Sequence, residues 1–196
     1  MEKRLSNAKI LGVISSILLA LTAFLPEVEI ILWIVGSVLL LISLNIMSDI
    51  FNDKRLFKNI LKSFVIILAG ITLALLVLLI AGVITGTSLS SLFTELMEIS
   101  LEEKPTINNI PIIFIIVLYL SYLYSSYYFK KAMDLLYEYT KIKLFRYGGL
   151  LYFISAILFV VVFLSTLADL IAFVLIAIGF FTIPEDITSK SLSEKT

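Results

Sequence analysis

Tyrosine is the side chain with a reactive group that is most concentrated in one segment of this chain, since all nine tyrosines lie between Tyr119 and Tyr152. The hydroxyls of Tyr119, Tyr122 and Ser126 would line a polar cleft if they turn toward neighbouring helices. Histidine and cysteine are absent, which removes imidazole bases, thiol nucleophiles and the soft metal ligands. We therefore expect no catalytic, metal-binding or cofactor-binding set, and a protein that is not an enzyme.

The same tyrosines have a simpler structural interpretation. A tyrosine ring prefers the apolar boundary of a membrane while its hydroxyl prefers water, so tyrosines gather as a belt at helix ends. An interfacial belt is the main interpretation here, and the polar cleft is the functional alternative.

Basic side chains lie among these tyrosines along the chain: Lys130, Lys131, Lys143 and Arg146. They are candidates for contact with anionic lipid headgroups or with a protein partner. No Gly-rich phosphate loop or nucleic-acid motif accompanies them. The favoured function is a non-catalytic membrane component that binds protein or lipid through this segment. A transporter or channel for a small neutral solute is the alternative, and a membrane enzyme is third.

Composition places the chain in a membrane. It is 60% hydrophobic and 15% charged, with a mean hydropathy of +1.09, which is more apolar surface than a soluble domain of this size can bury. Since a spanning helix needs about 20 apolar residues, the uncharged stretches predict an all-α, polytopic transmembrane bundle in one domain. Its six expected spans are 8–25, 29–48, 63–84, 109–129, 147–164 and 167–183.

The last apolar run is short for a span. Thr166 and Asp169 resemble a capping box, which would start the sixth helix near Leu167. The alternative is a bundle of five spans whose last segment is re-entrant.

The charges alternate along the chain. Fourteen of the fifteen lysines and arginines lie in the N-terminal segment, in the second and fourth connections between the expected spans, and in the tail at 185–196. Because such residues mark the cytoplasmic side, we expect a plasma-membrane protein with both termini in the cytoplasm. The other connections hold Lys104 and seven acidic residues, among them Glu27, Glu29 and Asp169.

Two further features concern packing. Apolar residues at helical spacing predict a helix over 89–103 on the outer membrane surface. Small residues four apart permit close helix approach, and we expect them to form packing seams within one chain, with a homo-oligomer contact as the alternative. These residues are Ala8, Gly12, Ser16 and Ala20, and in a later run Gly70 and Ala74.

Two connections resemble a known family. The passages SYYFKKAMDLL (126–136) and YTKIKLFR (139–146), with the earlier SDIFNDKRLFKN (48–59), are similar to an archaeal integral-membrane family called domain of unknown function 996. The resemblance implies an archaeal polytopic protein, and it implies no activity, substrate or cofactor.

Overall fold

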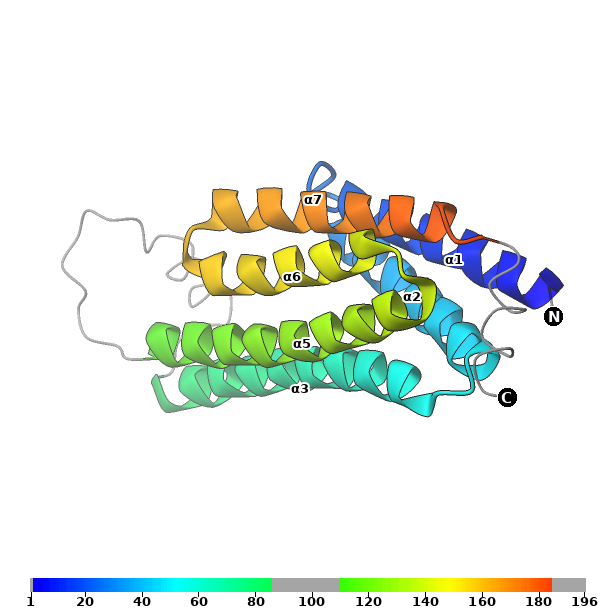
Figure 1. Ribbon diagram of the computed structural model, residues 1–196. Helices are drawn as coiled ribbons and strands as arrows, with labels where there is room; N and C mark the ends of the chain where they lie inside the picture. Colours follow the sequence, from blue (N-terminus) through cyan, green and yellow to red (C-terminus); the bar gives the residue numbers. More distant parts are fainter. Residues whose placement is uncertain (1, 86–109, 185–196) are drawn as a thin grey trace. The chain divides into compact units, whose positions relative to one another are not determined.

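The computed structural model describes residues 2–85 and 110–184. Within those residues the chain forms six α-helices, one 3-10 helix and no strand (Figure 1). This confirms the all-α helical class. The elements are α1 (Glu2–Leu21), α2 (Glu29–Ile50), α3 (Lys54–Thr85), α5 (Ile110–Thr140), α6 (Lys143–Ile157), η1 (Leu158–Val160) and α7 (Val162–Phe181).

Five of these helices are long and apolar enough to cross a membrane. Many of their large apolar side chains point outward, as Val83, Phe163 and Ile30 do with exposures of 84%, 77% and 74%. Apolar surface on this scale is unfavourable in water and favourable against hydrocarbon. The helices therefore indicate a membrane protein.

The final hairpin differs from the expected helix boundaries. Helix α6 has 15 residues and α7 has 20, so the short element is α6, and the last apolar run forms a complete helix. At about 1.5 Å per residue, α6 rises about 22 Å, less than the hydrocarbon thickness of about 30 Å.

The capping box expected at Thr166 is wrong. Helix α7 begins four residues earlier, after Val161, whose side chain makes no capping hydrogen bond. The Thr166 hydroxyl instead donates to the Val162 carbonyl within the helix. Asp169 therefore lies inside α7, and not in a connection between helices.

The described chain divides into two compact units. The larger unit contains residues 1–64 and 123–196, and the smaller contains 65–122. In the larger unit, α1 packs against α2 and α7, and α6 packs against α7 (Figure 1). Its core consists of Leu, Ile, Ala, Met and Phe side chains, with Leu44, Met47 and Phe145 fully buried.

Two connections in the larger unit use a left-handed residue. Asn52, between α2 and α3, has φ 52°, and Lys141, between α5 and α6, has φ 58°. The Lys141 amide donates to the Tyr137 carbonyl at 2.8 Å, which ends α5 with a left-handed cap. Both connections turn sharply at residues that are not glycine.

The expected surface helix at 89–103 and the tail at 185–196 lie outside the described residues.

Candidate functional site

Six helix termini and two turns lie at one end of the larger unit. Arg4 of α1 reaches Asp49 of α2 at 3.3 Å, and Lys9 donates to the Ile183 carbonyl at 2.5 Å. The rings of Phe145 and Phe180, from α6 and α7, pack edge to face at 5.0 Å. We call this region the basic end, defined by the N-termini of α1, α3 and α6, the C-termini of α2, α5 and α7, and their turns.

Asp53 is the centre of the turn between α2 and α3. Its carboxylate accepts hydrogen bonds from the Arg55 guanidinium at 2.7 and 3.0 Å and from the Tyr139 hydroxyl at 2.5 Å. The Tyr139 ring stacks on Phe51 at 4.7 Å, and the Ser48 hydroxyl donates to the Asp53 carbonyl at 2.8 Å. These contacts join the turn to the end of α5.

The electrostatics of Asp53 follow from these donors. The side chain is 11% exposed, and the hydrogen bond from Arg55 holds the pKa of its carboxyl well below the usual 3.8, with a smaller contribution from Tyr139. Asp53 is thus ionised at neutral pH. Sequence inspection missed this cluster because Tyr139 stands 86 residues away.

Asp49, four residues earlier, has separate partners. It accepts from Lys54 at 2.5 Å and from Arg4 at 3.3 Å. Asp49 therefore has a structural role at the end of α2.

Lys130 is also engaged by an acidic residue. Its ammonium lies 2.6 Å from the Asp134 carboxylate, one turn further along α5. The second Asp134 oxygen, Oδ1, is buried and has no hydrogen-bond partner among the described residues. Much of the Lys130 charge is thus neutralised within its own helix.

Lys131 and Lys62 share an aromatic ring. The Lys131 ammonium lies 4.5 Å from the centre of the Tyr127 ring and 5.8 Å from that of Tyr128, and the Lys62 ammonium lies 5.1 Å from the same Tyr128 centre. Both lysines are exposed, and within residues 2–85 and 110–184 neither forms an ion pair. Lys62, Tyr128 and Lys131 form what we call the lysine clamp, of which the sequence indicated Lys131 and missed Lys62.

The other two expected basic contacts lie on α6. Arg146 is exposed and its guanidinium stands 5.7 Å from the centre of the Tyr137 ring. Lys143 is exposed at the first residue of the helix. Cations near aromatic faces are stabilised without losing their charge, so both remain available to an anion.

The expected polar cleft involves three residues of α5. Tyr119 and Tyr122 are partly exposed. Ser126 is completely buried, and its hydroxyl donates to the Leu123 carbonyl of the same helix at 2.9 Å. The Ser126 hydrogen is thus already used inside α5, and the cleft remains a prediction.

Small residues of α1 lie in contacts within the chain. A Cβ added at Gly12 would stand 2.5 Å from the Phe180 ring of α7, and the Ala8 carbonyl accepts from the Ser43 hydroxyl of α2 at 2.7 Å. Ser16 and Ala20 are buried in the same helix. In the smaller unit, Gly70 packs directly against the Ser121 side chain, and Ala74 is fully buried.

A second glycine seam was missed. An added Cβ at Gly148 would stand 2.6 Å from Ile176 of α7, and one at Gly149 would stand 2.7 Å from Met133 of α5. This glycine pair lets α6 approach two helices at once. Adjacent glycines in a tyrosine-rich, basic segment were the available signal.

Asp169 lies about 10 Å along α7 from its first residue, at about 1.5 Å per residue. It is partly exposed and accepts a hydrogen bond from the Ser155 hydroxyl of α6. The Ser165 hydroxyl donates to the Ser155 carbonyl at 3.0 Å. These polar groups join α6 to α7, which explains how α7 accommodates a carboxylate within an apolar run.

Together, the described structure is an apolar helical bundle with a basic, aromatic end. Within the described residues, no group of three or more His, Cys, Asp or Glu side chains could hold a metal ion. The functional groups of the basic end that we describe are charged side chains and hydroxyl groups.

Comparison with known proteins gives the family. The model of a family described as protein of unknown function (DUF996) matches residues 32–174, and the chain belongs to this family, as its two basic connections predicted. It is 31% identical over 190 residues to "Uncharacterized protein MJ1644" of the archaeon Methanocaldococcus jannaschii, covering 97% of this chain and 99% of that protein. No solved structure matches the chain.

Proposed function

We propose that this protein is a non-catalytic, multi-pass membrane component that binds the headgroup of an anionic lipid at the lysine clamp. The observation that carries the proposal is the position of the Lys62 and Lys131 ammonium groups over one ring, that of Tyr128, at 5.1 and 5.8 Å from its centre.

Unlike four other cations of the basic end, the two lysines of the clamp have no acidic partner among the described residues. Arg4, Lys54 and Arg55 are bound to Asp49 or Asp53, and Lys130 is bound to Asp134. Two positive charges held near one ring repel each other, and an anion between them reduces that repulsion. A phosphate group suits this pair of lysines, since its oxygens can accept hydrogen bonds from ammonium groups.

The surroundings of the clamp favour a lipid as the source of that phosphate. Tyr124 and Tyr127 are 61% and 42% exposed on the same stretch of α5, as expected for rings at a membrane interface. Lysine side chains near helix ends extend along apolar surface until the ammonium reaches the headgroups. The clamp would thus meet phosphates of the adjacent leaflet.

We assign that leaflet to the cytoplasmic face of the plasma membrane, with both termini in the cytoplasm. The support is the distribution of charge, because fourteen of the fifteen lysines and arginines fall in the N-terminal segment, the second and fourth connections and the tail, and such residues mark the cytoplasmic side of membrane proteins. Anionic lipids of that leaflet attract basic segments by about 1 kcal/mol per Lys or Arg.

The test compares two double variants by native mass spectrometry with added phosphatidylglycerol or phosphatidylcholine. Lys62→Gln with Lys131→Gln removes the clamp, and Lys58→Gln with Lys141→Gln removes two exposed lysines of the same end. Since each clamp lysine would lose a hydrogen bond to the phosphate, worth about 1 kcal/mol, loss of the clamp should weaken phosphatidylglycerol binding about 30-fold. The control pair should weaken it several-fold less.

Equal losses in the two double variants would mean that only the total charge matters, and the clamp proposal would fail. A protein partner is the other outcome. If both variants bind phosphatidylglycerol as the unaltered chain does, and a co-purifying protein is lost only without the clamp, the site binds protein.

A further inference from the structure

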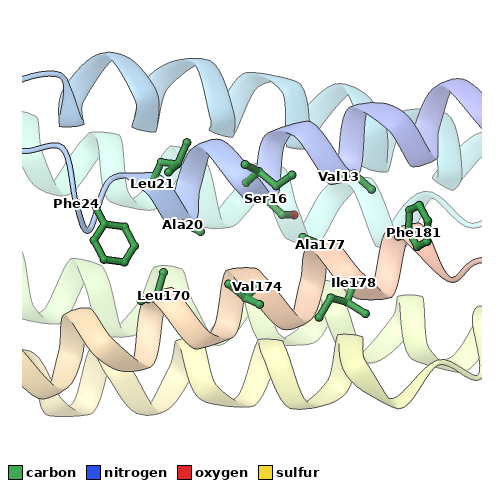
Figure 2. Close-up of a pocket in the computed structure, with 11 residues that line it drawn as sticks. Val13, Ser16, Ala20, Leu21, Phe24, Leu170, Val174, Ala177, Ile178 and Phe181 are labelled. Carbon is green, nitrogen blue, oxygen red and sulfur yellow. The ribbon is translucent and has the colours of Figure 1, made fainter.

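A groove runs between α1 and α7 in the larger unit, away from the clamp residues. It encloses about 440 Å³ and is lined by apolar side chains of both helices. Figure 2 shows the lining side chains along the two helices, with Phe24 at one end and Phe181 at the other. The hollow exists because the side chains of Ser16, Ala20 and Ala177 are too small to fill the space between the helices.

The chemistry of the groove selects a hydrocarbon. The one hydroxyl in its lining belongs to Ser16, and that hydroxyl already donates to the Gly12 carbonyl at 2.8 Å. A polar ligand would lose its hydrogen bonds to water there and gain none. An alkyl chain loses nothing and gains contact with the apolar walls.

The length of the groove suits one lipid chain. From Leu170 to Phe181, α7 rises about 16 Å at about 1.5 Å per residue. One leaflet contributes about half of a hydrocarbon core that is about 30 Å thick. A single chain of a membrane lipid, entering at Phe181 and running toward Leu170, would fill this length.

A positive charge stands where the headgroup would lie. Beyond Phe181 the groove adjoins a second hollow of about 290 Å³, lined in part by Ser6 and Lys9. The Lys9 ammonium uses one donor on the Ile183 carbonyl, and an ammonium has three. Among the described residues the Lys9 ammonium makes no other hydrogen bond, and Ser6, which lines the same hollow, is exposed.

We infer that the groove holds one hydrocarbon chain of an anionic phospholipid whose phosphate lies at Lys9 and Ser6. The apolar lining, the length of one leaflet and the basic end together specify this occupant. The site is independent of the lysine clamp, since the two share no residue, so either can fail without the other.

The test measures lipid retained by the purified full chain, using native mass spectrometry with phosphatidylglycerol and phosphatidylcholine. Ala177→Trp fills the groove, and Ala69→Trp places the same ring at an exposed position of α3 as a control. We expect Ala177→Trp to retain one phosphatidylglycerol fewer than the unaltered chain, and Ala69→Trp to retain the same number.

Lys9→Gln tests the headgroup position without altering the groove. It should weaken phosphatidylglycerol binding about fivefold, since one charge near a membrane surface contributes about 1 kcal/mol, and it should weaken phosphatidylcholine binding less, because the choline group cancels the charge of that lipid's phosphate. If Ala177→Trp fails to fold, as judged by circular dichroism, phosphatidylglycerols with shortened chains replace it. These should bind more weakly as the chain becomes shorter than the groove.

Two results would overturn the inference. One is unchanged lipid retention in a folded Ala177→Trp variant, or, where that variant does not fold, affinity independent of chain length. The other is an Ala177→Trp variant that retains the same lipid but changes its oligomeric mass. That result would make a second copy of the chain the occupant of the groove.

Discussion

Two connections of the larger unit are built in different ways. The turn between α2 and α3 is held by side chains, with Asp53 bound to Arg55 and Tyr139. The connection between α1 and α2 is held by backbone turns, such as Phe24 N–H to the Leu21 carbonyl at 3.0 Å. Its residues from Phe24 to Val28 are all exposed.

This difference shows which end of the larger unit is structurally specified. At the basic end, polar side chains from distant parts of the sequence bind one another and fix how the helices meet. At the α1–α2 connection the apolar helices are joined by a short segment that needs no distant partner. Substitutions should therefore change the free energy of unfolding strongly at the basic end and weakly at the α1–α2 connection.

The largest effect is expected for Asp53→Ala. This change leaves the Arg55 guanidinium and the Tyr139 hydroxyl without their shared acceptor, and we expect a loss of about 3 kcal/mol in the free energy of unfolding. Asp49→Ala is the matched control, because its carboxylate is 33% exposed and its partners Arg4 and Lys54 are more exposed still, so water already screens these ion pairs and a much smaller loss is expected. Chemical unfolding in detergent micelles measures both, and equal losses would contradict the distinction.

Gly148→Ala should come next. The new methyl group would lie 2.6 Å from Ile176 and 2.9 Å from the Ala172 carbonyl oxygen, and overpacking of this kind costs about 1–3 kcal/mol. At Gly179, the nearest atom is 3.0 Å away on the Phe145 ring. Gly179→Ala should therefore cost less in the same unfolding assay, and the reverse order would show that α6 does not depend on its glycine seam.

Acid should reproduce part of the Asp53 effect. Arg55 keeps the pKa of Asp53 below its usual 3.8 in the folded chain, so its stabilising contribution is fully present above pH 3.8 and is lost as the pH falls through the folded value. The difference in unfolding free energy between the unaltered chain and Asp53→Asn should be constant from pH 7 to pH 5 and decrease below about pH 4. A difference that already decreases between pH 7 and pH 5 would point to another titrating group.

The smallest effect is expected in the connection between α1 and α2. Glu27 is exposed, and substitutions at such positions change stability by less than about 0.5 kcal/mol. Glu27→Gln should therefore unfold as the unaltered chain does. A loss comparable with that of Asp49→Ala would show that this connection also depends on side-chain interactions.

Much of the fold could be predicted from the sequence because the apolar runs coincide with helices and charged residues interrupt those runs near the helix ends. Pro26 with Glu27, and Asp53 with Lys54, fall where α1, α2 and α3 end or begin. The last hairpin could not be predicted in this way. Asp169 looked like a break, yet the Ser155 hydroxyl binds its carboxylate and the helix continues through it.

Only part of the candidate site could be predicted from the sequence, for a similar reason. Lys130 and Lys131 are adjacent in the sequence, but Lys130 is bound to Asp134 and Lys131 lies over Tyr127. Lys62 belongs to another helix, and nothing in the sequence shows that it shares the Tyr128 ring. Residue types could thus be predicted, whereas partners depend on how the helices pack.

The most direct test of the account asks which side of the membrane each connection faces. The chain has no cysteine, so Glu27→Cys, Lys58→Cys and Lys141→Cys each introduce one thiol for a membrane-impermeant maleimide. On intact cells we predict labelling of Glu27→Cys alone, and labelling of Lys58→Cys and Lys141→Cys only after permeabilisation. Labelling of Glu27→Cys and Lys141→Cys from the same side would contradict the proposed orientation and, with it, the assignment of the lysine clamp to the cytoplasmic leaflet.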